Sequence, residues 1–402
     1  MLNTTAIKEY AYELGFDMAR ISSAEAFPET ERVIKERIAQ GLMDGLPWFT
    51  VERADVSCHP DALLPDARSI ISLAMFYLTE QPDEQHVQET PQGLRGQISR
   101  YAWGDDYHEV IKPKLQQFAL WLRQYARGEV NGELETRLFV DTGRMVDRAV
   151  AQRAGLGWFG KNTNILTKGW GSWVFLAEIV TNLPLAADTP TRANCGSCEI
   201  CLHACPTQAF PAPYVLDNTR CISYLTIELR GSIPIELRPL MGNLIFGCDI
   251  CQQVCPVNKV VEKRLGFKKE AGEAGKLLQV RRREEFRPRA GIGSNPELIP
   301  LLSLTEEQFR ERFRSSPIRR TKRRGLLRNV CVALGNSGDP LAIPALINAL
   351  SDYEPLVRGH AAWALGRIGG DQALGALKDA LLAESDEEVM KEIEYALLLM
   401  KQ

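Results

Sequence analysis

Eight of the ten cysteines lie within 61 residues, and their spacing is typical of iron–sulfur ligands. The first run reads C-x2-C-x2-C-x3-C-P and comprises Cys195, Cys198, Cys201 and Cys205, followed by Pro206. In two-cluster ferredoxins the first three thiolates of such a run hold one cubane, and the fourth holds the other. A second, shorter run comprises Cys248, Cys251 and Cys255, and Cys221 is the unassigned cysteine nearby. The pattern therefore predicts two clusters that would conduct electrons.

We assign the eight thiolates to two [4Fe–4S] clusters. One set is Cys195, Cys198, Cys201 and Cys255, and the other is Cys205, Cys221, Cys248 and Cys251. The alternative is a pair of zinc sites, because paired C-x2-C elements also suit tetrahedral zinc. The x2-x2-x3-Pro spacing fits iron–sulfur ligation better than zinc. Disulfides are not expected, because the first 16 residues contain no apolar segment of a secretory signal.

The composition is that of a folded globular protein. Of the 402 residues, 45% are hydrophobic and 25% are charged, which excludes a chain that is disordered throughout. The longest apolar run covers roughly residues 69–78 and is too short to span a bilayer. We therefore expect a cytoplasmic protein that has no membrane partner and is a monomer.

The net charge of −3 conceals a basic segment. Residues 281–328 contain 14 Lys and Arg but only 6 Asp and Glu. A basic block within this segment has no acidic residue among its charges, which are Arg319, Arg320, Lys322, Arg323, Arg324 and Arg328. Such a block is typical of a surface that binds the phosphates of a nucleic acid. The alternative is a solvated helix face.

Hydrophobic periodicity predicts the elements that could position these residues. Helices are expected over residues 6–14, 29–40 and 107–127, and buried strands over residues 69–78 and 173–180. A short strand over residues 138–140 ends in Asp141-Thr142-Gly143, and a helix with Val146, Val150 and Ala154 on one face follows. Polar residues at several strand ends would gather in one region, where α/β folds usually bind ligands.

The chain divides into four predicted parts. These are an α/β domain over residues 1–190, a ferredoxin-like module with two clusters over 191–262, a basic linker over 263–325 and all-α HEAT-like repeats over 326–402. The repeats are visible because the Ala-Leu-Gly of residues 333–335 recurs at residues 364–366, a spacing of 31. Helical hairpins of this period stack to bury a common core and usually present a surface to a macromolecule.

Seven short segments together resemble the epoxyqueuosine reductase family, which is similar to the reductive dehalogenases. They are WGDDYH at 103–108, VDTG at 140–143, DRA at 147–149, AGLGW at 154–158, GKN at 160–162, CISYL at 221–225 and GCDIC at 247–251. The resemblance runs from about residue 30 to the C-terminus. It implies reduction of epoxyqueuosine to queuosine at the wobble position of tRNA, the last step of queuosine formation.

The same resemblance implies cofactors and partners. They are a cobalamin in the α/β domain, two [4Fe–4S] clusters that feed it, an external low-potential electron donor and a tRNA held partly by the repeats. The cobalamin-binding residues that it implies are Arg53, Ser99, Asp141, Ile165, Leu176, Cys221, Asp249 and Ile250. Ser99 departs from the family pattern, because some members have a cysteine at this place. The tRNA-binding residues that we expect are Ser223 and Arg230, together with Arg319, Arg320, Lys322, Arg323 and Arg324 of the basic block.

Asp141 is the candidate proton donor, because the resemblance places the catalytic acid at this position. The reaction leaves an alkoxide, which is a poor leaving group until an acid protonates it. The role requires a carboxyl group that keeps its proton near neutral pH, which burial beside the corrin would favour. The alternative is an N-cap or turn aspartate that opens the following helix.

Two other function classes fit parts of the sequence. One is a cobalamin-dependent reductase of another small molecule, such as a halogenated compound, which leaves the basic block and the repeats without a purpose. The other is a non-catalytic electron-transfer protein, which leaves Asp141 and the α/β domain without one.

Overall fold

The computed structural model describes residues 3–80, 94–129, 133–265, 283–289 and 292–401. The chain forms two compact units, each assembled from three stretches. The first comprises Met1–Thr79, Asp106–Thr219 and Ile250–Glu285, and the second comprises Glu80–Asp105, Arg220–Asp249 and Phe286–Gln402. The compact units do not follow the predicted domain boundaries, because the cysteine-rich residues 191–262 are divided between them.

The first unit is built on a four-stranded sheet with the strand order β1-β2-β7-β4. The strands are β1 (Met18–Ser23), β2 (Ser69–Phe76), β4 (Thr136–Phe139) and β7 (Val174–Thr181). The three predicted strands are therefore confirmed. Every neighbouring pair is antiparallel, so the rule that places ligands at the carboxyl ends of parallel strands does not apply to this sheet.

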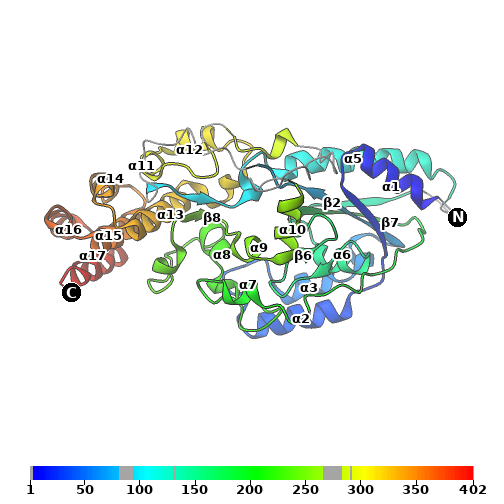
Figure 1. The fold of residues 1–402 in the computed structure, drawn as a ribbon, viewed down its shortest axis with the longest axis horizontal. Helices are drawn as coiled ribbons and strands as arrows, with labels where there is room; N and C mark the ends of the chain where they lie inside the picture. Colours follow the sequence, from blue (N-terminus) through cyan, green and yellow to red (C-terminus); the bar gives the residue numbers. More distant parts are fainter. Residues whose placement is uncertain (1–2, 81–93, 130–132, 266–282, 290–291, 402) are drawn as a thin grey trace. The chain divides into compact units, whose positions relative to one another are not determined.

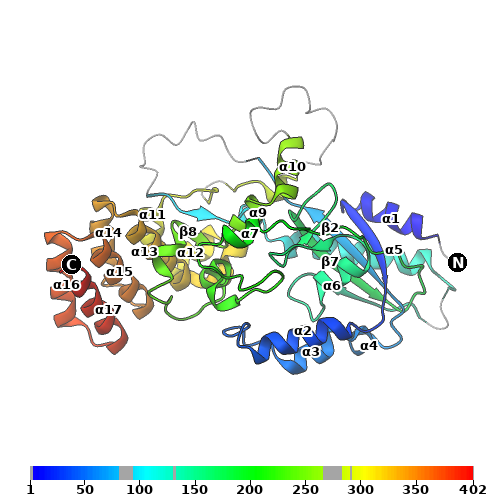
Figure 2. The ribbon, with the colours of Figure 1, turned by 60° about the horizontal axis from the view of Figure 1, so that its bottom comes forward.

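Helices cover both faces of this sheet (Figure 1). α1 (Thr4–Glu13) and α5 (Tyr107–Tyr125) pack on one face, where Tyr107 stacks on Phe175 of β7. α6 (Asp147–Arg153) packs on the other face, where Ala151 and Ala74 share an apolar cluster. α2 (Pro28–Ala39), α3 (Val51–Ser57) and α4 (Pro60–Leu63) lie on the α6 side (Figure 2). Within the described residues, no helix is long and apolar enough to cross a membrane.

Short elements carry the cysteines of the first unit. The hairpin of β5 (Trp158–Phe159) and β6 (Ile165–Leu166) precedes β7 along the chain. α7 (Ile200–His203) lies within the first cysteine run and packs against α9 (Ile250–Gln253) of the second run. α10 (Pro256–Arg264) follows directly, and its N-cap is Cys255. Contacts between segments distant in the chain therefore bring the two cysteine runs together.

The second unit begins with a pair of short parallel strands, β3 (Gln97–Ile98) and β8 (Leu244–Phe246). It also contains α8 (Ile222–Ile227), α11 (Leu298–Leu302) and α12 (Glu306–Arg312). The expectation that residues 263–325 form only a linker is wrong, because Leu298, Phe309 and Phe313 are buried and α11 packs on α13 (Lys322–Ser337). Residues 266–282 and 290–291 of this stretch lie outside the described residues.

The repeats form a stack of helices at the end of the second unit. α13 is followed by α14 (Ile343–Ala349), α15 (Pro355–Ile368), α16 (Asp371–Ala383) and α17 (Glu387–Leu399). α15 packs between α13 and α17, as the 31-residue period predicts. The recurring glycines permit this approach, because a Cβ at Gly335 would lie 2.9 Å from Ala364 Cα and one at Gly366 would lie 2.7 Å from Ala396 Cα.

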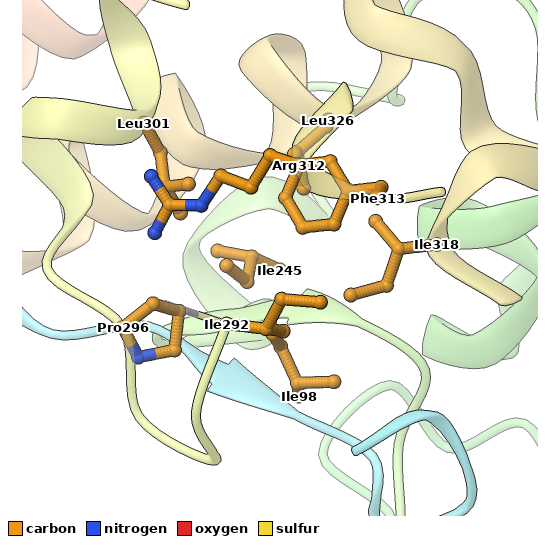
Figure 3. A pocket seen from close by; sticks show the side chains of 9 residues that line it. All are labelled: Ile98, Ile245, Ile292, Pro296, Leu301, Arg312, Phe313, Ile318 and Leu326. Carbon is orange, nitrogen blue, oxygen red and sulfur yellow. The ribbon is translucent and has the colours of Figure 1, made fainter. Parts of the chain in front are cut away.

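Short 3-10 helices complete the structure: η3 (Arg100–Ala102), η4 (Asn218–Arg220), η5 (Arg238–Met241), η7 (Glu284–Phe286), η8 (Pro317–Thr321) and η9 (Pro340–Ala342). The core of the second unit contains a narrow apolar gap, toward which Ile98, Ile245 and Phe313 point (Figure 3). A water molecule does not fit into it. We therefore assign this gap to the packing of the core and not to a ligand.

Candidate active site

Asp141 lies in the loop after β4, which ends at Phe139. Its backbone adopts the left-handed conformation with a φ of +48°, which aspartate tolerates better than most residues. Its side chain is exposed, and the hydroxyl of Tyr107 donates a hydrogen bond to its Oδ2. The N-cap of α6 is Val146, so the alternative interpretation of Asp141 as a helix cap is wrong. The Asp141 carboxyl group therefore does not cap a helix and is exposed in the loop.

Arg53 of α3 anchors the Asp141 loop. Its Nη2 donates a hydrogen bond of 2.6 Å to the carbonyl oxygen of Gly143. A larger residue does not fit at position 143, because a Cβ there would lie 2.5 Å from Phe139 Cδ1. The sequence predicted Arg53 and Asp141 for one cofactor site, and the structure places both at this loop. Their contact with cobalamin stays a prediction.

Tyr107 orients the Asp141 carboxyl group. Its ring is buried and stacks on Phe175, with 4.3 Å between the ring centroids and 10° between the ring planes. The stacking holds the phenol in place, so that its hydroxyl points to Asp141. In the sequence, Tyr107 is the first residue of the helix predicted over residues 107–127, and it belongs to the family-like segment at 103–108.

Two further carboxyl groups, of Glu178 and Asp147, lie close to Asp141, and sequence reasoning missed both. Glu178, in the middle of β7, has an exposed fraction of 0%, and burial raises its pKa well above the usual value. The charges of Asp147 and Asp141 raise it further. Burial also raises the pKa of Asp147 to about 7. The one signal in the sequence was a single acidic residue within the apolar strand of residues 174–181.

The two apolar residues predicted for cobalamin lie in one cluster. Ile165 of β6 is buried, and the partly buried Leu176 of β7 packs against the same cluster. Leu176 lies on the same strand as Glu178, two residues before it. The structure therefore brings these two residues together, on the α6 side of the sheet. The alternative is that both are ordinary core residues. This explains the buried Ile165 better than the partly buried Leu176.

In the second unit, Ser99 and Asp249 are joined by hydrogen bonds. The Ser99 hydroxyl donates to Asp249 Oδ1 at 2.6 Å, and the backbone N–H of Arg100 donates to Oδ2 at 2.7 Å. Gly247 has a φ of +69°, and a Cβ there would lie 2.5 Å from Ser99 Cβ. The predicted cofactor residues Ser99 and Asp249 are thus adjacent. Ile250, the next residue, begins α9 in the first unit and is half-buried.

The first predicted set of cysteines lies close together. Burial raises the pKa of the Cys201 thiol, and the negative charges of the other three members raise it further. Burial likewise raises the pKa of Cys255, as do the charges of two members of the set, Cys195 and Cys198. Thiolates that repel one another in this way need a cation, and a cluster supplies it. The donor set therefore fits a [4Fe–4S] cluster.

The same region does not have the geometry of a single metal ion. Within the described ranges, no three His, Cys, Asp or Glu side chains converge closely enough to hold one ion. A zinc ion would require its thiolate sulfurs at about 2.3 Å from a common centre. A cubane distributes its ligands over four irons and spaces them more widely. The ligand assignment of the first set remains a proposal.

Cys205 and Cys251, both in the first unit, receive hydrogen bonds at their sulfur atoms. The backbone N–H of Ala209 donates to Cys205 Sγ at 3.4 Å, and Asn164 Nδ2 donates to Cys251 Sγ at 4.0 Å. Asn162 of the same hairpin donates to the Cys251 carbonyl oxygen at 3.3 Å. Hydrogen bonds to sulfur help to set the potential of a cluster. Cys221 and Cys248 belong to the second unit, and their role as ligands stays a prediction.

The candidate tRNA-binding residues Arg230 and Arg320 lie side by side. Arg230 Nη1 donates to the Arg320 carbonyl oxygen at 2.8 Å, and Arg320 Nε pairs with Glu228 at 2.5 Å. Ser223 is a half-buried residue of the neighbouring α8, and Thr321 Oγ1 bonds to the Thr226 carbonyl oxygen of that helix. The structure therefore joins two regions of the predicted tRNA site that lie far apart in the sequence.

The basic block is only partly at the surface. Arg319, Arg320 and Lys322 are exposed, and Arg324 is half-buried. Arg323 has an exposed fraction of only 5% and pairs with Asp352 at 2.5 Å. Its guanidinium group is used inside the repeats, so the structure does not support its predicted contact with phosphate.

Arg328, the remaining charge of the block, has an exposed fraction of 0%. It donates to the backbone carbonyl oxygens of Leu225, Leu229 and Gly231. These bonds attach α13 to the segment after α8. Arg328 is therefore a structural residue, and the predicted phosphate-binding surface reduces to Arg319, Arg320, Lys322 and the half-buried Arg324.

Models of three known families match the chain. The family described as "Epoxyqueuosine reductase QueG, DUF1730" matches residues 58–142. The 4Fe-4S double cluster binding domain matches residues 194–258, which contain all eight clustered cysteines. HEAT repeats match residues 319–398. The expected fold class, an α/β domain with a ferredoxin-like iron–sulfur module and HEAT-like repeats, is confirmed.

Relatives named epoxyqueuosine reductase match nearly the whole chain. The protein of Pseudomonas aeruginosa is 39% identical over 90% of this chain and 94% of its own length. That of Bacillus subtilis is 36% identical over 98% of this chain and 95% of its own. A crystal structure of epoxyqueuosine reductase with an epoxyqueuosine-modified tRNA-Tyr stem loop is 35% identical, covers 99% of both chains and superposes with a TM-score of 0.87. Identity at this level over nearly the full length shows that the chain belongs to the epoxyqueuosine reductase family.

Proposed function

We propose that this chain reduces epoxyqueuosine in tRNA to queuosine, with Asp141 as the proton donor. The observation that carries the proposal is the Asp141 loop, in which Tyr107 orients an exposed carboxyl group and Arg53 holds the backbone. A structure of the Bacillus subtilis relative is described with its aspartate catalytic loop swung out of the active site, which supports an aspartate on a loop as the catalytic group.

The reaction balances with two electrons and two protons. Both C–O bonds of the epoxide break, an alkene forms between the two carbons, and the oxygen leaves as water. Asp141 protonates the oxygen as its first C–O bond opens, because an alkoxide would otherwise be a poor leaving group. The electrons come from an external low-potential donor through the iron–sulfur clusters.

Cobalamin is the proposed redox cofactor. When bound, it would supply a cobalt centre that stores electrons and delivers them to the substrate. The chain offers an apolar cluster that contains the buried Ile165 and the partly buried Leu176, and polar groups at Arg53 and Asp141, which suits a corrin ring with amide side chains. The contact of Ser99 and Asp249 with cobalamin, which the family resemblance implies, stays a prediction.

The decisive experiment is anaerobic reconstitution of the full chain with cobalamin and its clusters. An epoxyqueuosine-containing anticodon stem loop is the substrate, and nucleosides are identified by mass spectrometry. We expect queuosine only in the presence of cobalamin and reductant. Full turnover by cobalamin-free protein would refute the cofactor, and dehalogenation of a halogenated phenol without queuosine formation would favour the rival reductase. Electron transfer without reaction on either substrate would favour the non-catalytic protein.

The members of the basic block that remain at the surface are proposed to hold the tRNA backbone. Arg319, Arg320 and Lys322 are exposed, and Arg324 is half-buried. We expect that neutralising Arg319, Arg320, Lys322 and Arg324 together to Gln weakens tRNA binding and flattens its dependence on salt. Each phosphate contact contributes about 0.7 to 0.9 to the slope of log affinity against log salt, so loss of four contacts should reduce the magnitude of the slope by up to about 3 to 4. Binding titrations at several salt concentrations measure this. The loss should be similar for all cognate anticodons, because phosphate contacts do not read bases.

A matched control removes four exposed charges elsewhere. Arg310, Lys378, Lys391 and Lys401 are all exposed, and their neutralisation changes the net charge by the same amount. We expect the control to keep the affinity and the slope of the native chain. If the variant of the basic block keeps the native dependence of tRNA affinity on salt, these residues are a solvated helix face and do not bind phosphate.

A further inference from the structure

The proposed reaction needs one proton more than Asp141 carries. Reduction of an epoxide to an alkene and water consumes two protons, and one carboxyl group holds only one. After Asp141 has protonated the oxygen at the first C–O cleavage, the second cleavage would release hydroxide unless a second proton arrives. The structure holds a candidate source directly beside the Asp141 loop.

Glu178 is a buried carboxyl group without a hydrogen-bond donor. Its exposed fraction is 0%, and within the described residues neither of its oxygens accepts a hydrogen bond from an N–H or hydroxyl donor. Glu178 instead shares a hydrogen bond with the Asp147 carboxyl group. It stands opposite Ser72 of β2 and Phe139 of β4 in the sheet. Phe139 ends β4, so the strand register places Glu178 next to the start of the Asp141 loop.

Asp147 approaches Glu178 from the helix that covers it. It is the first residue of α6, which packs on β7 from the face that Glu178 occupies. Its Oδ1 is buried and has no hydrogen-bond partner in the described part of the chain. Glu178, Asp147 and Asp141 therefore form an acidic cluster. No N–H or hydroxyl group of the described residues stabilises the buried carboxyl oxygens of Glu178 or the Asp147 Oδ1.

The positive charges near this acidic cluster do not offset the cost of burying its carboxylates. A hydrogen bond with Glu178 and the charges of Arg148 and Arg53 lower the pKa of Asp147, but less than its burial raises it. Arg20 of β1 lies opposite Ser72 in the sheet and is within 3.9 Å of Asp188. Tyr107, whose ring stacks on Phe175 on the other face of the sheet, donates from its hydroxyl to Asp141, and His108 Nδ1 pairs with Asp106. A carboxylate with no donor in an apolar interior is costly, and protonation removes that cost.

We propose that Glu178 and Asp147 form an internal proton store that recharges Asp141 within each turnover. Once Asp141 has given its proton to the substrate oxygen, a proton moves from Asp147 to the Asp141 carboxylate, and Glu178 replenishes Asp147. Asp141 then protonates the departing oxygen at the second C–O cleavage, and water leaves. Two protons pass to oxygen, no electrons move within the store, and solvent refills it afterwards. Glu178 and Asp147 act through Asp141 and do not touch the substrate. The inference rests on the proposed function.

The test compares Glu178→Gln with the native chain, both as cluster- and cobalamin-loaded enzymes. The amide keeps the size of the side chain but holds no acidic proton. We expect at least a tenfold lower rate at neutral pH and a changed pH profile, with affinity for the stem loop unchanged. Glu178→Asp, which keeps a carboxyl group, should recover part of the rate. Glu135→Gln, which alters an exposed carboxyl group, should match the native chain in every measurement.

Two readouts do not depend on activity. The infrared spectrum of the native chain at neutral pH should show the C=O stretch of protonated carboxyl groups, and this band should be weaker in Glu178→Gln, which lacks the contribution of Glu178. The variant should also be more stable than the native chain at neutral pH. The pKa of Glu178 is raised in the folded state, so ionisation of the unfolded chain lowers stability as pH rises above about 4.5. The variant should not show that loss.

The outcomes separate a store from a structural residue. A destabilised Glu178→Gln with a native pH profile, or a Glu178→Gln with a native rate although its carboxyl band is weaker, would overturn the proposal. If the native chain forms no queuosine, the proposed function fails. The infrared band and the stability then still show whether the buried pair holds a proton.

Discussion

The Asp141→Asn variant is expected to form queuosine about 10²- to 10⁴-fold more slowly than the native chain. The amide has nearly the same shape as the carboxyl group, and the Tyr107 hydroxyl can still donate to its oxygen. It has no acidic proton to give, so the opening epoxide would leave an unprotonated alkoxide. The loss should appear in the rate constant of a single turnover, measured by rapid quenching and nucleoside analysis.

Binding should remain intact in this variant, which separates loss of the acid from loss of the fold. Iron content, cobalamin binding and affinity for the stem loop are expected to stay close to native. Asp66→Asn is a matched control, because Asp66 is also an exposed aspartate in the left-handed conformation, with a φ of +58°. It should react at the native rate. A single-turnover rate near native for Asp141→Asn would exclude Asp141 as the proton donor.

The Cys201→Ala variant is expected to lose one of two clusters and with it the reduction of the substrate. The native chain should hold about eight irons and as many acid-labile sulfides in two cubanes. Cys201 and Cys255 belong to the same proposed set, and the charge of Cys255 raises the pKa of Cys201. Each single replacement should therefore halve the iron content and remove the same cluster, as judged by electron paramagnetic resonance of the reduced protein.

Controls for this experiment come from the two cysteines outside the runs. Cys58 and Cys331 are fully buried among apolar side chains and belong to neither set. Their replacement by Ala should leave the iron content unchanged, although stability should fall because a cavity forms. Stoichiometric zinc without sulfide in the native chain would contradict the assignment, as would loss of different clusters from Cys201→Ala and Cys255→Ala.

The sequence alone predicted the features that depend on residues close together in the chain. The prediction of cluster ligation follows from the spacing of Cys195, Cys198 and Cys201, because a short loop must wrap one cubane. The helix over residues 107–125 and the strand over 69–76 follow from hydrophobic periodicity, which acts within a few residues. The stacking of α13, α15 and α17 follows from a period visible in the sequence.

Only the tertiary structure showed which charged residues are buried and what they face. Arg323 and Arg319 look alike in the sequence, but Arg323 lies inside the repeats against Asp352, 29 residues away. Glu178 is one acidic residue in an apolar strand, and the strand register together with the packing of α6 leaves it without a donor. Such environments are made by contacts between distant segments, and no local pattern of residue types records which segments will meet.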